Sequence, residues 1–441
     1  MSTSQTGRLG AVVMAGGMGT RMRSHLPKHL HPLLGRRMVD WVLEVARRME
    51  ADPLVLVAGP ETAGAFDDVA VAIQREARGT GDAVRCARGV LEGRASEVLV
   101  LSGDTPLVTP GLLRALVETH RREEAWATVL SFETDDPRHY GRIVRNGGGG
   151  LEAIVEARDA TPAQLAVREV NSSIYVFRAD RLWPALDRLT PDNAQGELYL
   201  TDTVSLLVAD GGRVAVHKGG DPMETEGVNT RVELAAAAAE LRDRVNEEHM
   251  LAGVTIVDPR STWIDAEVVL EPDAVVHPFT VIRGASRIAA GAEIGPHAVV
   301  VDAEIGERAL VGPFCYVRPG TVLEADAKAG TFVEIKNARI GERAKVPHLS
   351  YIGDADVGED TNVAAGNITA NQAHTREKQR TVIGRNVRTG VDNTFVAPVT
   401  VGDDAWIAAG SVITEDVPPG ALAIGRARQI VKEGRGGKRD D

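Results

Sequence analysis

The amino-acid sequence predicts an α/β domain with a mostly parallel sheet, followed by a parallel β-helix of six-residue repeats. Three observations lead to this prediction. Up to about residue 228, short apolar runs alternate with helix-like stretches. One long segment then lacks both Gly and Pro, and aliphatic residues afterwards recur at every sixth position. The length of 441 residues is enough for two or three domains.

The first half of the chain has the pattern of a sheet covered by helices on both faces. Apolar runs such as Gly10–Met14 and Val98–Leu101 are separated by stretches such as Met38–Met49 and Gly111–Arg122, which have the composition of helices. Strands buried on both faces are continuously apolar, because βαβ crossovers place helices on both sides of the sheet. We therefore expect a Rossmann-like domain over residues 1–229.

The segment that follows predicts one long helix. Residues 230–251 are rich in Ala, Leu, Glu and Arg and contain neither Gly nor Pro. This composition favours an uninterrupted helix. We expect residues 230–251 to link two domains.

From about residue 253, aliphatic residues recur with a period of six. Seven successive positions match this period without exception: Ile264, Leu270, Val276, Ile282, Ile288, Ile294 and Val300. After short slips the period continues as far as Ile413. Neither the helical period of 3.6 nor the strand period of 2 explains it. A period of six is typical of a left-handed parallel β-helix, here over residues 252–430, with a polar and disordered tail at 431–441.

A prism built from six-residue sides is narrow. Aromatic residues make up only 4% of the chain, which suits such an interior because Phe, Tyr and Trp would overfill it. Ligands of this domain must therefore bind on its outer faces, and we expect clefts between copies in an oligomer.

Composition and charge exclude several classes of protein. The net charge of −12 disfavours a general nucleic-acid binder or a polybasic membrane sensor, because both need a positive field. The start of the chain, Met1–Arg8, has no apolar secretion core, and no apolar run approaches the roughly 18 to 20 residues that span a bilayer. Cys86 and Cys315 form no paired metal-ligand spacing. We expect a cytoplasmic protein with no nucleic-acid or membrane partner.

The turn after the strand Ala11–Met14 is rich in glycine and is followed by two basic residues, Arg21 and Lys28. Glycines allow the backbone amides to point at an anion, and the two cations add positive charge. The segment is not a P-loop, and it fails the dinucleotide fingerprint because Met22 stands where the third glycine would be. It predicts a phosphate-binding loop of another kind.

This loop resembles the signature of the sugar-phosphate nucleotidyltransferases, which is Gly-x-Gly-Thr-Arg with Pro-Lys several residues later. Further matches follow in chain order: Gln74 with Gly79–Ala83, Leu101–Pro106, Tyr140–Arg142, Ile154–Glu156, Glu169–Asn171 and Glu226–Asn229. Together with the repeats behind it, the chain is similar to the bacterial bifunctional N-acetylglucosamine-1-phosphate uridylyltransferases and glucosamine-1-phosphate N-acetyltransferases of the GlmU type. The resemblance covers roughly residues 9–430.

The resemblance implies a uridylyltransferase site in the first domain. The residues implied to bind UTP and UDP-N-acetylglucosamine are Ala15, Gly16, Gly17, Lys28, Gln74, Gly79, Thr80, Gly141, Glu156, Asn171 and Asn229. Arg21 and Lys28 would act in catalysis by holding the triphosphate, and Asp104 and Asn229 would bind Mg²⁺. A sugar phosphate oxygen is already an anion, so its attack on UTP needs alignment and charge neutralisation rather than a strong base.

The second domain contains a basic and histidine cluster. Arg318 and Lys336 are 18 residues apart, which is one full turn of three six-residue sides, so both lie on one edge and can clamp a phosphate. By the resemblance, Arg318, Lys336, Tyr351, Asn362 and Lys378 bind the acetyl acceptor glucosamine-1-phosphate. His348 is implied as the general base, and imidazole can accept a proton near neutral pH.

Acetyl-CoA is implied as the second co-substrate beside UTP, with Asn371, Ala409 and Arg426 among its contacts. It would lie between adjacent subunits, so the resemblance implies a homotrimer. The partners are then small molecules and further copies of the chain.

The sequence departs from the family at several positions. Ser102, Ser173 and Arg158 stand where the family often has Tyr, Gly and Lys. In the second domain, Asn371-Gln-Ala-His374 replaces a common Asn-Tyr-Asp-Gly, and Val391 replaces a small polar residue. Either the acceptor site is rebuilt with Gln372 or His374, or the second activity is weakened or retargeted.

Two alternatives to the bifunctional enzyme follow. The altered loop favours a monofunctional nucleotidyltransferase whose β-helix serves assembly only, whereas Arg318, Lys336 and His348 argue against it. A scaffolding protein with an inactive transferase domain would be expected to lose Arg21, Lys28 or Asp104, and all three are present.

Overall fold

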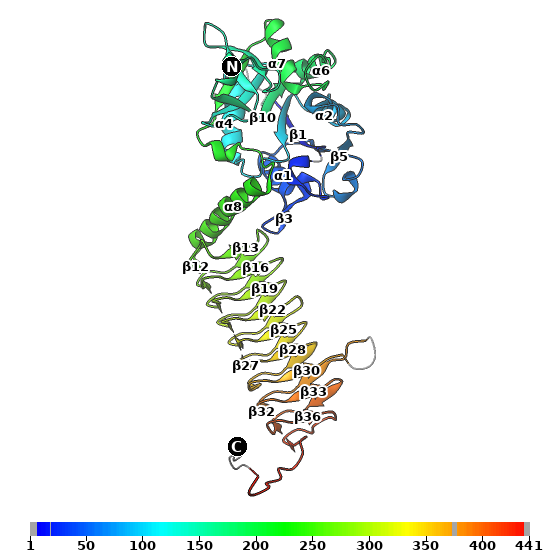
Figure 1. Ribbon diagram of the computed structural model, residues 1–441, viewed down its shortest axis with the longest axis vertical. Helices are drawn as coiled ribbons and strands as arrows, with labels where there is room; N and C mark the ends of the chain where they lie inside the picture. The colour runs from blue at the N-terminus through cyan, green and yellow to red at the C-terminus, as the bar shows by residue number, and fades with distance from the viewer. Residues whose placement is uncertain (1–6, 18, 373–376, 436–441) are drawn as a thin grey trace, which may run out of the picture. The chain divides into compact units, whose positions relative to one another are not determined.

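The computed structural model describes residues 7–17, 19–372 and 377–435 (Figure 1). The chain divides into two compact units, Met1–Glu240 and Leu241–Asp441. The predicted long helix is α8 (Arg231–Leu251), and the division falls within it. The helix begins at Arg231 because Thr230 caps it: the Thr230 hydroxyl accepts a hydrogen bond from the Glu233 amide at 3.2 Å. Ala373, His374 and the end of the tail from residue 436 lie outside the described residues.

The first unit is built around a mixed sheet with strand order β11-β7-β10-β6-β1-β4-β5. Its strands are β1 (Leu9–Ala15), β4 (Leu54–Ala58), β5 (Ala70–Ile73), β6 (Glu97–Ser102), β7 (Ala127–Glu133), β10 (Glu169–Arg178) and β11 (Val214–Lys218). Strand β10 runs antiparallel between β6 and β7, whereas the pairs among β1, β4, β5 and β6 are parallel. The hairpin β8 (Arg142–Arg145) and β9 (Leu151–Val155) joins β10. The predicted Rossmann-like class is confirmed.

Helices cover both faces of this sheet. They are α1 (Met38–Arg48), α2 (Thr80–Cys86), α3 (Arg88–Leu91), α4 (Pro110–Arg122), α5 (Pro162–Leu165), α6 (Ala179–Leu186) and α7 (Leu200–Ala209). Short elements complete the unit: the strands β2 (Pro32–Leu33) and β3 (Arg36–Arg37) and 3₁₀ turns at Thr20–Met22, Lys28–Leu30, Ala63–Ala65 and Pro222–Glu224.

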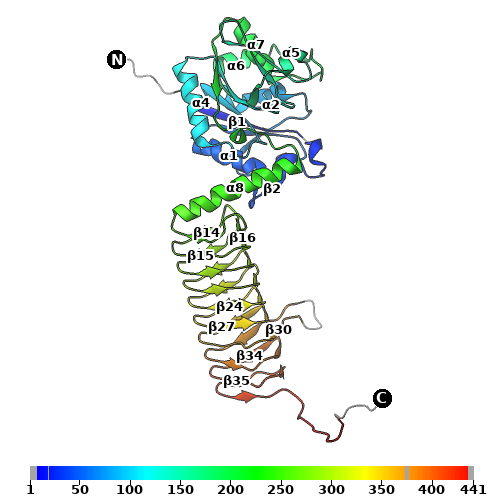
Figure 2. The ribbon, with the colours of Figure 1, turned by 60° about the vertical axis from the view of Figure 1, so that its left-hand side comes forward.

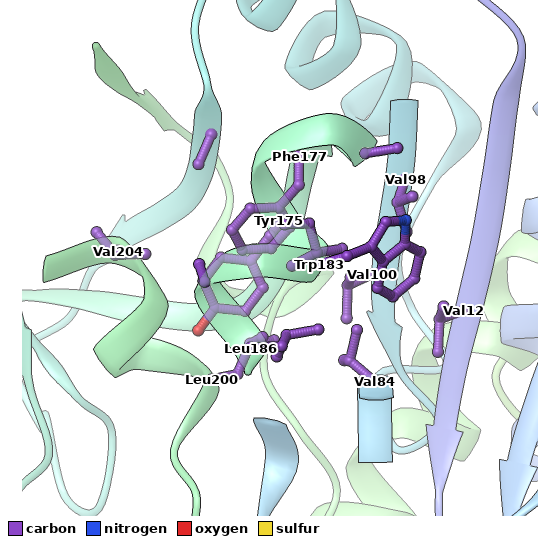
Figure 3. Close-up of a cluster of buried hydrophobic side chains, with 14 of the residues drawn as sticks. Val12, Val84, Val98, Val100, Tyr175, Phe177, Trp183, Leu186, Leu200 and Val204 are labelled. Atoms are coloured by element: carbon purple, nitrogen blue, oxygen red, sulfur yellow. The ribbon is translucent and has the colours of Figure 1, made fainter. Parts of the chain in front are cut away.

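Two hydrophobic clusters flank the sheet, because successive side chains of a strand point to opposite faces. Along β1, Val12 joins the cluster of α2, α6 and α7, whereas Ala11 and Val13 join that of α1 and α4. Figure 3 shows the first cluster, in which Trp183 of α6 and Tyr175 of β10 lie among smaller aliphatic side chains. Each core strand is thus buried on both faces, as its continuous apolar run predicts.

The second unit is a parallel β-helix whose coils stack regularly (Figure 2). The first face contains β12 (Thr255–Ile256), β15 (Val275–Val276), β18 (Glu293–Ile294), β21 (Leu310–Val311), β24 (Lys328–Thr331), β27 (Lys345–His348), β32 (Arg388–Thr389), β35 (Trp406–Ile407) and β37 (Leu422–Ala423). Asn362 bridges β27 and β32, because it pairs with Lys345 and with Arg388.

The other two faces are built in the same way. The second face contains β13 (Trp263–Ile264), β16 (Val281–Arg283), β19 (Val299–Val301), β22 (Tyr316–Val317), β25 (Glu334–Lys336), β28 (Tyr351–Gly353), β30 (Ile368–Ala370), β33 (Thr394–Val396) and β36 (Val412–Ile413). The third face contains β14 (Val269–Leu270), β17 (Arg287–Ile288), β20 (Glu304–Ile305), β23 (Val322–Leu323), β26 (Arg339–Ile340), β29 (Ala355–Val357), β31 (Thr381–Ile383) and β34 (Val399–Val401).

The six-residue period corresponds to the sides of this prism. In each two-residue strand through the regular part, the second residue is buried, as for Ile264, Leu270 and Val276. The aliphatic residues therefore form most of the interior, as predicted. The ring of Phe395 in β33 is fully buried there as well, so the expectation that an aromatic ring would overfill the prism is wrong at this coil. None of the described helices has the length and apolar character that crossing a bilayer requires.

A buried histidine in the first unit leads to a prediction about pH. His120 of α4 is 2% exposed and its Nδ1 lies 2.9 Å from the Thr128 hydroxyl. Burial lowers its pKa from 6.5 to about 4, so the folded state holds this histidine neutral where the unfolded chain takes up a proton. Stability is thus full above about pH 6.5 and falls toward pH 4, by up to about 3 kcal/mol from this residue.

Urea unfolding at pH 7 and at pH 4.5 measures this effect. H120Q has no titrating group at this position, so its loss of stability between the two pH values should be smaller than that of the wild type. Equal losses in the two proteins would contradict the prediction.

Candidate active sites

A cavity of about 410 Å³ lies at the carboxyl ends of β1 and β6. Strand β1 lies between β4 and β6, so the strand order reverses at β1. Open α/β sheets bind their ligands at such a switch point, outside the carboxyl ends of the strands. Ala15, Gly16 and Gly17 line the cavity after β1, and Gly103 and Asp104 line it after β6. The predicted phosphate loop and the predicted metal ligand therefore open into one cavity.

Two glycines of the loop are required by close packing. Gly19 has φ of 66°, and a Cβ there would lie 2.5 Å from the Cβ of Lys28. A Cβ on Gly16 would lie 2.6 Å from Oε1 of Gln74. A larger residue at position 19 would collide with Lys28 as well as strain the backbone.

Lys28 is the centre of the site. Its Nζ bonds to the Asp104 carboxylate and, at 2.9 Å, to Oδ1 of Asn229. Arg21 Nη2 donates to the same Asn229 oxygen at 2.9 Å. The two proposed catalytic cations and the two proposed metal ligands, from three distant segments, are therefore in direct contact.

The Asp104 carboxylate is held ionised. Its side chain is 19% exposed, and the Ser102 hydroxyl donates to it at 2.6 Å. Burial by itself raises the pKa of Asp104, but the charge of Lys28 and the hydrogen bonds from Lys28 and Ser102 outweigh it and lower the pKa below its usual value. Ser102, which the family resemblance marks as a departure, thus positions this carboxylate.

A second cavity of about 340 Å³ shares Arg21, Asp104 and Asn229 with the first. Tyr140 lines it, and its hydroxyl accepts a hydrogen bond from the Gly227 amide at 3.1 Å. Burial raises the pKa of Tyr140 to about 12, so it stays protonated and can donate to a ligand. Because the two cavities share these lining residues, the second adjoins the first.

The structure brings Gly141 and Glu156 together but turns Asn171 away. A Cβ on Gly141 would lie 3.5 Å from Oε1 of Glu156, whose pKa is raised mainly by burial. Glu156 and Arg158 line a small adjoining cavity. Asn171 is 2% exposed and donates to the Tyr175 hydroxyl at 2.6 Å, so Ser172 and Ser173 line the second cavity in its place.

Ser173 occupies a left-handed backbone position with φ of 62°, next to a bulge in β10. Glycine adopts this conformation without a steric cost, which explains why the family often has glycine here. The Asn171 side chain accepts a hydrogen bond from the Ser173 amide at 3.1 Å and stabilises the bend.

The second cluster lies on the second face of the β-helix. The register pairs Val317 with Ile335, which places Arg318 directly beside Lys336 on the next coil, as the 18-residue spacing predicts. Arg318 donates to Glu334 at 2.7 Å, and the charge and proximity of Lys378 lower the pKa of Lys336. Three cations therefore gather at one place, which favours a phosphate ligand.

Tyr351 and Asn371 complete this cluster. Asn371 Nδ2 donates to the Tyr351 hydroxyl at 3.3 Å and to the Asp354 carboxylate. Asp354 is 7% exposed and also accepts from Asn337 at 2.6 Å. Asn371, expected beside acetyl-CoA, thus lies with the acceptor residues. In the sequence, only its place three residues after Tyr351 marks Asp354.

His348 and Asn362 lie on the first face. His348 ends β27, is exposed, and its ring has no hydrogen-bond partner among the described residues. Asn362 pairs with Lys345, three residues before His348. One chain alone therefore brings Asn362 to a different face from Lys336 and Tyr351.

Near the end of the β-helix, the Arg426 guanidinium donates to the Ala409 carbonyl oxygen. These two residues, both expected to contact acetyl-CoA, are neighbours in the structure. Among the described residues, no group of three or more His, Cys, Asp or Glu side chains could hold a metal ion.

Comparisons with known proteins match both halves of the chain. Residues 11–201 match the MobA-like NTP transferase domain, and residues 380–415 match the hexapeptide repeat of succinyl-transferase. The bifunctional protein GlmU of Streptomyces coelicolor is 46% identical, over 96% of this chain and 93% of the relative. That of Mycolicibacterium vanbaalenii is 47% identical over 96% and 92%, and that of Pelobacter propionicus is 43% identical over 96% and 97%. Because the similarity runs through both units at this level, the chain belongs to the family of bifunctional GlmU proteins.

Proposed function

We propose that the cavity between β1 and β6 is where the enzyme transfers a uridylyl group from UTP to N-acetylglucosamine-1-phosphate and releases pyrophosphate. The contact of Lys28 with Asp104 and Asn229 is the observation that carries this proposal. A sugar phosphate oxygen forms the new bond to the α-phosphorus while the bond to pyrophosphate breaks. The attacking oxygen is already an anion, so the chain needs to supply alignment and positive charge.

The residues of the site suit these tasks. Arg21 and Lys28 present two cations to the triphosphate, and the glycine-rich turn leaves its backbone accessible. The sugar would occupy the adjoining cavity, where Tyr140, held protonated by burial, can donate a hydrogen bond. Tyr140, Ser172 and Ser173 thus set the shape of the sugar pocket.

Asp104 and Asn229 are suited to hold Mg²⁺. Their side-chain oxygens already share one cation, the Lys28 ammonium, which shows that both can face a single positive centre. Mg²⁺ takes few protein ligands and keeps water and phosphate oxygens, so two such residues suffice. When bound, Mg²⁺ neutralises charge on the pyrophosphate leaving group.

Replacing Asp104 tests this assignment. In D104A the Lys28 ammonium loses its counter-ion and the metal loses its carboxylate, so uridylyl transfer should fall about 10²-fold or more. Acetyl transfer by the same preparation serves as the control, because its residues lie in the other unit, and it should not change. A normal Mg²⁺-dependent rate of D104A would show that the metal is held elsewhere.

The second activity is acetyl transfer from acetyl-CoA to the amine of glucosamine-1-phosphate. We propose that Arg318, Lys336 and Lys378 hold the phosphate, since the structure gathers these cations beside Tyr351. The amine nitrogen forms the new bond to the acetyl carbon while the bond from that carbon to sulfur breaks. His348 takes the proton of the amine and passes it to the leaving thiolate, so coenzyme A leaves as the thiol. Asn371 keeps its contact with Tyr351 although the residues after it depart from the family.

His348 is tested by H348A. The loss of a general base lowers the rate about 10²-fold or more, so acetyl transfer should fall by that factor while uridylyl transfer stays unchanged. R318A and K336A should mainly raise KM for glucosamine-1-phosphate, because they bind the phosphate in the ground and transition states alike. Coenzyme A release, followed with a thiol reagent, measures all three. An unaffected kcat in H348A would remove this histidine from the mechanism.

The assembly-only alternative for the β-helix is not favoured. Relatives named bifunctional match 96% of the chain, and the cation cluster on the second face is intact. We propose residues 1–229 and 252–430 as the domains that carry the two activities, and the cytoplasm, which supplies UTP and acetyl-CoA, as their location. Both Cys86 and Cys315 are free thiols, which suits a reducing compartment.

We further propose that the β-helix forms a trimer along the edge between its first and second faces. Four rings stack there at centroid distances of 4.8, 4.8 and 5.2 Å. They belong to Phe279, His297, Phe314 and Phe332, and Leu349 continues the row at the same corner. Each has a left-handed φ between 48° and 59°, a conformation that bulky residues rarely adopt.

This aromatic row is exposed in the single chain, with Phe332 58% and Leu349 62% accessible. The third face instead carries outward charges such as Arg287, Glu304 and Arg339. Three copies joined along the row would place the first face of one copy against the second face of the next. Asn362 of one copy would then approach Lys336 of another, which one chain alone does not achieve.

A charge in the row should prevent assembly. F314K/F332K places two ammonium groups in the seam, so the mass from analytical ultracentrifugation should fall from trimer toward monomer, and acetyl transfer should fall with it. V269K, a change at an exposed apolar position on the third face, is the matched control and should remain trimeric. Full assembly of F314K/F332K would place the interface on another surface.

A further inference from the structure

The amide of Gln74 is held in one orientation at the edge of the nucleotide cavity. Gln74 directly follows β5 and is 7% exposed. Its Nε2 donates to the Gly79 carbonyl oxygen at 3.1 Å and to Oδ2 of Asp82 at 3.0 Å. Both N–H groups of the amide are therefore used inside the protein.

The partners determine which way the amide faces. A backbone carbonyl and an ionised carboxylate accept hydrogen bonds and cannot donate them. A flipped Gln74 would set its Oε1 against two other oxygens and would leave a buried carboxylate oxygen without its donor, which is costly. The Oε1 atom of Gln74 must therefore point away from Asp82.

Asp82 is itself held in place. It lies in α2, is 8% exposed, and its Oδ1 accepts a hydrogen bond from Arg85 Nη2 at 2.6 Å. One carboxylate oxygen thus binds Arg85 and the other binds Gln74. The orientation of Gln74 therefore follows from the pair of Asp82 and Arg85.

The Oε1 atom of Gln74, which takes part in neither of these hydrogen bonds, faces the cavity. Oε1 of Gln74 lies near Gly16, where an added Cβ would be 2.6 Å away, and it has no hydrogen-bond partner among the described residues. Gln74, Gly79 and Thr80 line the same cavity as Lys28, Asp104 and Asn229. Because the phosphates of a nucleotide take the cations, its uncharged base is left for the neutral part of the lining, which includes Gln74.

We propose that Asp82 is a specificity-determining residue that makes Gln74 an obligatory hydrogen-bond acceptor toward the base. An acceptor at this position pairs with a ring N–H, which uracil has at N3. Cytosine has a lone pair at the same position, so it would meet the Gln74 oxygen with repulsion. The inference rests on the proposed uridylyl transfer and names the group that makes it selective for uracil over cytosine.

The experiment compares UTP with CTP in D82N. The substituted amide can donate to Gln74 and so permits the flipped orientation, which presents an N–H to the base. The ratio of kcat/KM for UTP to that for CTP should fall about tenfold or more, the effect of replacing one hydrogen bond to the base by an unsatisfied polar group. Pyrophosphate release with each nucleotide, at fixed sugar phosphate and Mg²⁺, gives the ratio.

Two further variants sharpen the result. In Q74E/D82N the substituted amide donates to the new carboxylate, which keeps an acceptor toward the base, so the preference for UTP should return. D187N is the matched control, since Asp187 also pairs with an arginine, Arg88, but at the surface, and its ratio should equal that of the wild type.

The outcomes separate this inference from the proposed function. A wild-type protein that fails to turn over UTP contradicts the proposed function itself. If the wild type is active with UTP and D82N has the same ratio of kcat/KM for UTP to that for CTP, the role of Asp82 is overturned. An equal loss of kcat/KM with both nucleotides in D82N overturns it as well. If D82N is too unstable to assay, the affinities of UMP and CMP are measured by calorimetry for the wild type and for Q74E/D82N. A loss of the preference for UMP in Q74E/D82N overturns the proposal.

Discussion

The Lys28 ammonium is the point on which the nucleotide site depends. It joins the loop after β1, the end of β6 and the segment before α8 through its contacts with Asp104 and Asn229. Asp104 is largely buried, and a buried carboxylate without a cation is unfavourable. Lys28 therefore stabilises the carboxylate in the free protein, and in the proposed mechanism the same ammonium supplies positive charge to the triphosphate.

The β-helix depends on a different constraint, the narrow interior of its prism. Each side admits one inward side chain, which is aliphatic at most positions and Phe395 at one, and the row from Phe279 to Phe332 is an exposed surface rather than a core. A prism with a filled interior has no internal pocket. The residues proposed for acetyl transfer accordingly lie on outer faces, and Asn362 and Lys336 lie on different ones.

The two sites share a device for orienting an amide. Asp82 accepts one N–H of Gln74 and Asp354 accepts one N–H of Asn371, so in both cases a buried carboxylate fixes which side of the amide carries its N–H groups. A carboxylate can only accept, and this removes the ambiguity of an amide that otherwise has two nearly equal orientations. Neither aspartate belongs to the ligand-binding residues that the sequence indicates, since each acts through its neighbour.

The sequence by itself determined the class of both units, the period of the β-helix, the glycine-rich turn after the first strand and the alignment of Arg318 with Lys336. Each of these depends on local composition or on a regular repeat, so residue spacing translates directly into position. Only the tertiary structure decided that Asn171 turns toward Tyr175, that Asn371 joins the acceptor cluster, and that Asp82 and Asp354 orient their amides. These outcomes depend on hydrogen bonds between side chains whose direction is set by packing, and spacing along the chain does not encode that direction.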